Sequence, residues 1–332
     1  MKPLLKFRLK PFYPALLWLI ALPVAAEFEI TGQLQQEYVN WSSAAIHLSG
    51  KQVGDGAVYI TDTNRHDQYG ASSITLKGSR NLRRDYRAVG AVGFDLDINH
   101  TADLQDGEAW LGFSSTQSLW RFGRMASPYR DATQSWDPFD ATFLQARGNG
   151  GLSLSHHSGY LQNSLAYQSN WWGVDLDFAW AMDQQDENQD GETDGDDTLA
   201  LALTKAMGGW TLALAREDDQ RSDRQASKFG ARFGHDSWQY QLQYERLEAA
   251  DDYGYDALFN LIWHSDLTQV AFSVGKTDAP SEFAAQLNYY ALGMKYAFTS
   301  DTIFHIGYRT TRTDASPNNN ERAVGMGLRF LF

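Results

Sequence analysis

The 332-residue sequence contains no cysteine, only eight prolines, and no apolar run long enough to form a spanning helix. Without cysteine there can be no disulfide, no thiol chemistry and no cysteine-ligated zinc. The apolar run near the start, Ala15–Leu22, is far shorter than the roughly 20 residues that a membrane-spanning helix needs. No H-E-x-x-H or G-x-S-x-G sequence occurs, so the usual signatures of zinc peptidases and serine hydrolases are missing. We therefore predict that the chain is not an enzyme.

Basic residues are also scarce, with 28 Lys and Arg against 41 Asp and Glu and a formal net charge of −13. The first 26 residues combine a basic start, the apolar run and a small-residue cleavage site ending at Ala26, which predicts a secretory signal peptide. An uncleaved membrane anchor is the alternative. Removing residues 1–26 takes away four basic residues and no acidic ones, which lowers the net charge of −13 by four, to −17. Such a chain repels nucleic acid, and no nucleic-acid partner is expected.

What the sequence does contain is apolar and polar alternation with a period of two, the pattern of a strand with two different faces. The last residues, 321–332, place apolar side chains at every second position and stop on Phe332. The chain has 11 Trp, 16 Tyr and 18 Phe although its mean hydropathy is only −0.46. Abundant aromatics in a hydrophilic chain are typical of outer-membrane barrels, whose aromatic girdles lie at both lipid interfaces.

Sixteen such strands can be placed along the chain. Short connections alternate with longer ones, as expected for periplasmic turns and external loops. The sequence therefore predicts one domain, residues 27–332, folded as an all-β, sixteen-stranded antiparallel transmembrane β-barrel. The predicted strands are 28–38, 72–79, 86–98, 106–113, 117–124, 160–168, 172–183, 197–206, 209–217, 226–234, 238–246, 255–263, 267–275, 285–298, 302–309 and 321–332.

Several short motifs, taken in order, resemble the trimeric, sixteen-stranded general porin family of Gram-negative bacteria. Ser73–Gly78 resembles its RxGFKG segment, and Glu108–Phe113 followed by Phe122–Arg124 resembles AxxGL…xxGR. Asn163–Ser169 resembles NSxxYxS, and Tyr290–Tyr296 resembles YxLGxxY. The resemblance spans most of the chain after residue 26 and implies an outer-membrane location, a homotrimer and contacts with lipid and lipopolysaccharide.

In that family the third loop folds into the barrel and narrows it, which implies the same for Met125–Gly159. The acidic residues Asp131, Asp137 and Asp140 of this loop would then face a cationic strip on the wall, near Arg124. The sequence departs from the family at two wall positions, Ser73 and Gly107, where arginines are common. Other arginines lie nearby and serve either the pore field or anchoring at the membrane edge; these are Arg80, Arg83, Arg84 and Arg87.

The faces opposite the apolar ones are rich in carboxylates, which outnumber bases such as Arg87 and Arg329. Acidic side chains on a low-dielectric wall concentrate cations. We therefore predict a passive diffusion channel for small hydrophilic solutes and ions, with a preference for cations. The expected lumen-facing carboxylates are Asp95, Asp97, Asp175, Asp177 and Glu245.

One loop motif has the spacing of a calcium-binding loop, D-x-N-x-D-G-x-x-D-x-x-D, with glycine at the sixth position. Apart from this possible calcium site, no cofactor is expected. The alternative is a solvated acidic loop that holds cations loosely between lipopolysaccharides. The candidate ligands are Asp186, Asn188, Asp190, Asp194 and Asp197.

Two other functional classes stay open. A substrate-selective channel, for sugars for example, could use Trp120, Tyr129 and Trp136 as a stacking track. A plugged barrel could act as a surface adhesin or receptor, given the long predicted first loop 39–71. His156 and His157 lie near Ser153 and Ser155 in the third loop, but they match no catalytic motif.

Overall fold

The computed structural model describes most of the chain from Ala26 onward. Of the predicted signal peptide only Ala26 is among the described residues. Within this part of the chain, no helix is both long and apolar enough to cross a membrane. The described ranges are 26–42, 47–48, 51–52, 57–61, 72–82, 85–97, 103–146, 160–182, 197–220, 224–249, 252–278, 286–313 and 321–332.

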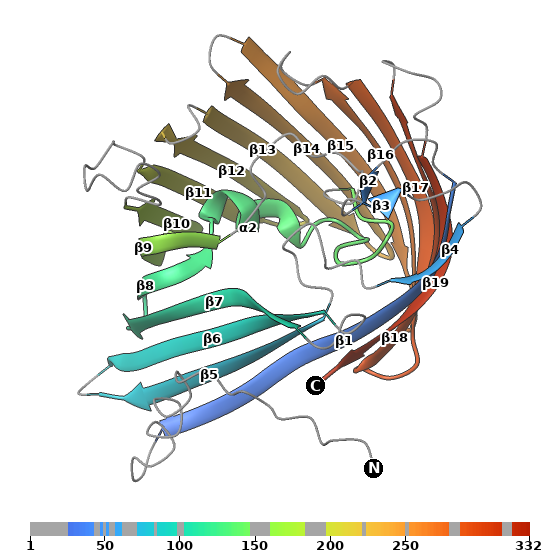
Figure 1. The fold of residues 1–332 in the computed structure, drawn as a ribbon. Helices are drawn as coiled ribbons and strands as arrows, with labels where there is room; N and C mark the ends of the chain where they lie inside the picture. The colour runs from blue at the N-terminus through green and yellow to red at the C-terminus, as the bar shows by residue number, and fades with distance from the viewer. Residues whose placement is uncertain are drawn as a thin grey trace, which may run out of the picture.

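Sixteen long strands form a closed antiparallel barrel, in which each strand pairs with the next one along the barrel wall (Figure 1). They are β1 (Ala26–Ser42), β5 (Ser73–Asn81), β6 (Arg87–Asp97), β7 (Asp103–Ser114), β8 (Ser118–Ala126), β9 (Tyr160–Trp171), β10 (Val174–Ala181), β11 (Thr198–Met207), β12 (Trp210–Asp219), β13 (Arg224–His235), β14 (Trp238–Ala249), β15 (Asp252–His264), β16 (Thr268–Asp278), β17 (Gln286–Ala297), β18 (Thr302–Thr313) and β19 (Glu321–Leu331).

The barrel closes where its first and last strands meet. Strand β1 pairs with β19 from Gln33–Leu331 to Ser42–Arg322, and its first half pairs with β5. The backbone groups of Gly32 and Phe332 exchange two hydrogen bonds, of 2.9 and 3.1 Å. Closure leaves no free edge among these sixteen strands, as a barrel in lipid requires.

The alternation in the sequence explains which way each side chain points. On β19 the apolar side chains of Val324, Met326, Leu328 and Phe330 are all about half exposed on the outer face. Glu321 and Ala323 of the same strand are buried on the lumenal face. An apolar outer face and a polar inner face are the two surfaces expected of a barrel whose outside contacts hydrocarbon.

The sixteen predicted strands all correspond to observed ones, with two local errors. The predicted loop 39–71 contains the end of β1 and three short strands, β2 (His47–Leu48), β3 (Lys51–Gln52) and β4 (Ala57–Thr61). Strand β4 pairs with residues 37–41 of β1, on the edge of β1 opposite to β19. Trp172 does not begin a strand, because it has φ +51° and forms a two-residue turn with Gly173. Its ring is 96% exposed.

The expected contrast between short and long connections is weaker in the second half of the barrel. Strands β14 and β15 extend beyond their predicted ends, so only residues 250–251 separate them instead of the predicted loop 247–254. The strands are longer because polar residues near their ends still alternate and pair, such as Glu248 with Tyr253.

One short helix, α2 (Pro128–Gln134), follows β8 within the predicted third loop. Ser127 caps it by accepting a hydrogen bond from the Tyr129 amide at 3.2 Å. Pro128 occupies the first helical position, where its missing N–H costs nothing. Figure 1 shows α2 inside the curve of the barrel, between β8 on one side and β11 and β12 on the other.

Candidate functional site

Residues 127–146, which we call the lumen segment, pack against the inner face of the barrel. The first anchor lies around α2. The Ser127 hydroxyl donates a hydrogen bond to Glu217 of β12, and the Tyr129 hydroxyl donates one to Glu245 of β14 at 3.2 Å. Lys228 of β13 donates to the Tyr129 carbonyl at 2.9 Å and lies 3.5 Å from the Glu245 carboxylate. Because Lys228 and Glu245 are both buried, their opposite charges stabilise each other there.

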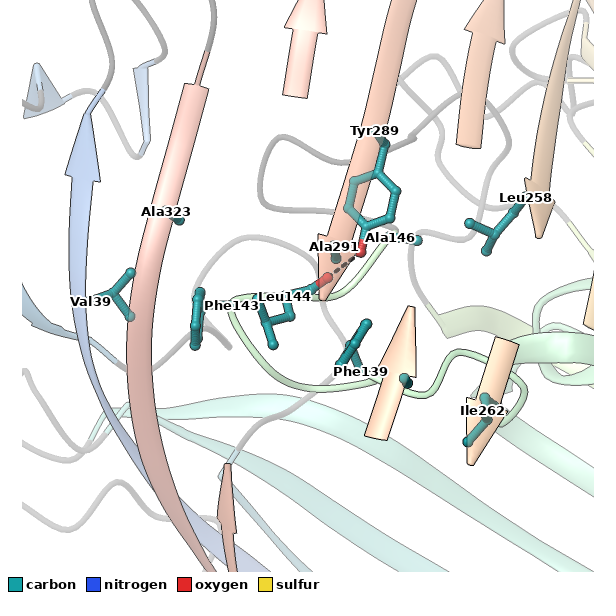
Figure 2. Packing of buried hydrophobic residues seen from close by; sticks show 11 residues of the cluster. Val39, Phe139, Phe143, Leu144, Ala146, Leu258, Ile262, Tyr289, Ala291 and Ala323 are labelled. Atoms are coloured by element: carbon teal, nitrogen blue, oxygen red, sulfur yellow. Dashed lines mark hydrogen bonds between the residues drawn. The ribbon is translucent and has the colours of Figure 1, made fainter. Parts of the chain in front are cut away.

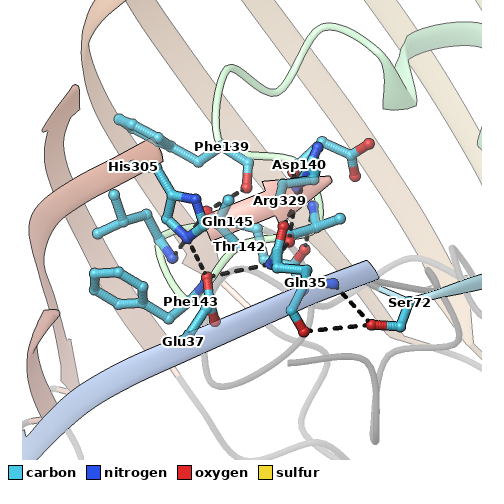
Figure 3. A network of polar contacts seen from close by, with 12 residues as sticks. Gln35, Glu37, Ser72, Phe139, Asp140, Thr142, Phe143, Gln145, His305 and Arg329 are labelled. Carbon is cyan, nitrogen blue, oxygen red and sulfur yellow. Dashed lines mark hydrogen bonds and ion pairs between the residues drawn. The ribbon is translucent and has the colours of Figure 1, made fainter. Parts of the chain in front are cut away.

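The second anchor ties the end of the lumen segment to the strands that close the barrel (Figure 3). Buried Glu37 of β1 accepts hydrogen bonds from the Phe143 amide, at 3.0 and 3.2 Å. The same carboxylate lies 2.7 Å from Nε2 of His305 on β18. Arg329 of β19 donates to the carbonyls of Asp140 and Ala141 at 3.0 and 2.9 Å. Three strands at the seam thus hold one short piece of backbone.

Apolar packing reinforces the second anchor (Figure 2). Phe139, Phe143 and Leu144 of the lumen segment are almost fully buried in one cluster with side chains of β1, β15, β16, β17 and β19. The Tyr289 hydroxyl donates a hydrogen bond to the Leu144 carbonyl. At about 25 cal/mol per Å² of apolar area, each such side chain contributes roughly 2 kcal/mol when it leaves water.

Glycines of the wall, among them Gly230, Gly293 and Gly307, form the sockets that receive this segment. A Cβ at Gly293 would lie 2.6 Å from Leu144 and 2.7 Å from Phe139. A Cβ at Gly230 would lie 2.7 Å from the Trp136 ring. The absence of side chains at these positions lets the lumen segment approach the sheet closely.

Two cavities flank α2. The larger, of about 600 Å³, lies between α2, β8–β13 and the turn before β8. Its wall carries Asp131, Asp175 and Asp177 and one cation, Arg232. The smaller, of about 270 Å³, lies on the other side of α2 against β1 and β5–β9.

Four of the predicted carboxylates line these cavities. Asp131, Asp175 and Asp177 border the larger one and Asp95 the smaller one. Asp177 accepts a hydrogen bond from Gln168 at 2.5 Å and lies 3.6 Å from Arg121. The position of these residues fits the predicted acidic lumen.

The other predicted carboxylates are placed differently. Glu245 is 1% exposed beneath α2, so it supports the lumen segment instead of lining open space. Asp137 accepts hydrogen bonds from the Phe139 and Ala146 amides, at 2.8 and 2.7 Å, and so shapes its own loop. Only the backbone of Asp97 is described.

Two further site residues belong to the inner surface. Burial raises the pKa of the Asp140 carboxyl above its ordinary value, while the positive charges of Arg329 and Lys295 act in the opposite direction. Arg124 lies with its guanidinium carbon 5.1 Å from the centre of the Tyr160 ring. A bulge between Gly123 and Met125, with Gly123 at φ +134°, lets both Arg121 and Arg124 face inward.

The expected aromatic track is not formed. The Trp120 ring lies 4.5 Å from the Tyr167 ring, centre to centre and tilted by 46°, on the outer side of the barrel beside exposed Phe113. Tyr129 is fully buried under α2, and Trp136 is buried in the socket at Gly230. The prediction treated the three as neighbours because the loop's own path was not known.

Most of the predicted calcium loop lies outside the described residues. Asp186, Asn188, Asp190 and Asp194 belong to this part, so calcium binding stays a prediction. Asp197 is described and accepts a hydrogen bond from the Trp180 ring at 2.9 Å. Within the described residues there is no group of three His, Asp or Glu suited to a metal ion. His156 and His157 also lie outside the described ranges.

Sequence reasoning missed the side chains that position the lumen segment. The side chains of these residues are buried on the inward faces of their strands; they are Glu37, His305, Glu217 and Lys228. The strand alternation indicates that these side chains face the lumen. It does not indicate which lumen-facing charges contact the third loop.

A closed antiparallel barrel with an apolar outside and a polar inside is the architecture of a membrane channel. A family model described as Gram-negative porin matches residues 15–316, and the chain belongs to this family. It is accordingly an outer-membrane porin. No curated protein matches the sequence.

Solved structures share the fold at low sequence identity. The anion-selective porin from Comamonas acidovorans has a TM-score of 0.74 and 14% identity, covering 92% of this chain and 100% of that one. OmpF of Salmonella typhi, in complex with daunomycin, has a TM-score of 0.70 and 14% identity, covering 91% and 97%. OmpT of Vibrio cholerae, in its trimer form, has a TM-score of 0.65 and 13% identity, covering 93% and 100%.

Proposed function

We propose that this porin is a passive diffusion channel for small hydrophilic solutes and that it prefers cations. The observation that carries the proposal is the charge on the cavity walls. The larger cavity has three carboxylates against one cation, Arg232. The smaller has Asp95 and Glu108 against Arg130. The net charge of −13 for the whole sequence has the same sign.

The physical basis is the field inside a narrow, low-dielectric wall. Charges that line such a passage raise the local concentration of counter-ions and lower that of co-ions, more strongly at low salt. The Comamonas structure is named for anion selectivity, but at 14% identity it shares only the fold. Selectivity depends on the side chains that reach the lumen, which the fold leaves free to vary.

Reversal potentials under a KCl gradient test this proposal. We expect the wild-type channel to prefer cations. In the Asp131→Asn/Asp175→Asn double variant the K⁺ to Cl⁻ permeability ratio should fall by about twofold, because two negative charges that attract K⁺ are neutralised. Asp266→Asn makes the same kind of charge change in an exposed turn, away from both cavities, and should leave the ratio almost unchanged. A wild-type preference for chloride would refute the proposed selectivity, and a silent bilayer would favour a plugged barrel.

We further propose a homotrimer in contact with lipid and lipopolysaccharide. The apolar outer face supports lipid contact, and the Vibrio cholerae OmpT structure, which shares the fold, is described as a trimer form. Chemical cross-linking in mild detergent tests the assembly. Cross-linked products no larger than a dimer would contradict the proposed trimer.

A further inference from the structure

The smaller cavity beside α2 has a polar lining of mixed charge. It is bordered by Ser73 and Thr75 of β5, by Asp95 of β6, by Glu108 of β7 and by Arg130 of α2. Its volume of about 270 Å³ suits a solute of amino-acid or dipeptide size.

The wall is shaped to leave this space. Strands β6 and β7 shift register between Val92 and Phe94, so the sheet is irregular at Gly93. A Cβ at Gly93 would lie 3.1 Å from the Glu108 side chain and 3.2 Å from the Thr75 hydroxyl. The missing side chain therefore keeps the floor of the cavity open between these two polar groups.

The negative charges lie on one side of the cavity. Asp95 of β6 is 8% exposed. Glu108 accepts a hydrogen bond from the Trp110 ring at 2.9 Å through one carboxylate oxygen, Oε2. Both carboxylates come from adjacent strands of the wall, β6 and β7.

The positive charge that borders this cavity belongs to Arg130 of α2. The guanidinium carbon of Arg130 is 5.3 Å from the centre of the Tyr160 ring, and that of Arg124 is 5.1 Å from it. Arg130 also donates a hydrogen bond to Gln134 at 2.9 Å, which fixes its direction. Its Nε also lies 3.9 Å from the Asp131 carboxylate. Stacking on an aromatic face together with such polar contacts holds a guanidinium in place at little further entropic cost.

Helix α2 separates the two cavities by charge. Successive helical residues point about 100° apart, so Arg130 borders the smaller cavity while the next residue, Asp131, borders the larger one. The loop therefore presents a cation, and the wall presents carboxylates, across the smaller cavity. This is the reverse of the acidic loop and cationic wall that the family resemblance implies.

We propose that this cavity is a subsite for small solutes carrying both an ammonium and a carboxylate group, such as amino acids and short peptides. The ammonium is directed to Asp95 and Glu108, and the carboxylate to Arg130 beside Tyr160. The inference rests on the proposed diffusion function and adds a solute class to it. A neutral solute of the same size gains neither contact.

Proteoliposome swelling with two matched probes tests the subsite. Glycylglycine carries both charges, and N-acetylglycinamide is its neutral counterpart of similar size. We expect the wild-type channel to admit glycylglycine about threefold faster at low concentration, because only this probe makes both charge contacts. The ratio of the two rates should fall to about one in Asp95→Asn and in Arg130→Gln.

Bilayer recordings of the same variants separate this site from general cation preference. Asp95→Asn should lower the K⁺ to Cl⁻ permeability ratio, and Arg130→Gln should raise it. The Asp95→Asn/Arg130→Gln double variant should have a permeability ratio near that of the wild type and should still admit glycylglycine no faster than N-acetylglycinamide. If Arg130→Gln does not fold, Glu108→Gln takes its place as the second variant, with the same expected loss of the advantage. Equal wild-type rates for the two probes, or a ratio that survives both substitutions, would overturn the subsite. Exclusion of both probes would instead refute the diffusion channel itself.

Discussion

Replacing Glu37 with alanine is expected to release the end of the lumen segment from the barrel seam. The substitution removes the acceptor for the Phe143 amide and leaves His305 without its carboxylate partner, although both stay buried. Breaking a buried pair of this kind costs about 3 kcal/mol or more. The population of undocked segment should rise by about 100-fold, because each 1.4 kcal/mol is a factor of ten.

Single-channel recording measures this release as excess open-channel noise and frequent brief changes of conductance. Glu37→Gln is the matched control, because its amide oxygen can still accept from the Phe143 amide, and it should lie between wild type and alanine. The heat stability of the folded barrel in detergent is measured beside it, to separate loop release from unfolding. Quiet, wild-type recordings from a folded Glu37→Ala channel would show that the carboxylate does not hold the segment.

A larger side chain in place of a socket glycine is expected to displace the lumen segment from the wall, although the sequence of the segment itself is unchanged. Valine at Gly230 would overlap the Trp136 ring and Thr133, and valine at Gly293 would overlap Leu144 and Phe139. Overpacking of this kind costs about 1–3 kcal/mol per site. Because the closest overlaps are with side chains of the lumen segment, the segment should move away from the wall into the open lumen and reduce conductance.

Conductance and the entry rates of graded neutral solutes report this narrowing. Gly234→Val is the control, because a Cβ there meets nothing within 4 Å although the residue lies on the same strand as Gly230. We expect both socket variants to exclude larger solutes more strongly than the control does. Unchanged size cut-offs in folded socket variants would mean that the segment adapts in place.

The sequence predicted the barrel well because its determinants are local. Each strand carries its own period of two, so residues such as Val324 and Met326 show their outward direction without reference to any partner. Errors arose where a single dihedral decides the structure. Trp172 looks like a strand residue in the pattern, but a left-handed conformation places it in a turn.

The site was only partly predictable, for a physical reason. Whether a lumenal carboxylate lines open space or supports the loop depends on which wall the loop packs against. Asp177 and Glu245 have the same parity on similar strands, yet the first borders a cavity and the second is covered by α2. The glycine sockets depend on the same packing of the loop against the wall. The alternation of apolar and polar residues therefore does not predict them.

The second anchor also has a kinetic consequence. Gln35 of β1 binds Arg329 of β19 although 294 positions separate them, and Glu37 meets His305 across 268. Contacts of such sequence separation form late, since the intervening chain must first be ordered. A partly assembled barrel thus has a wide lumen, and its bore becomes narrow only in the final step of folding.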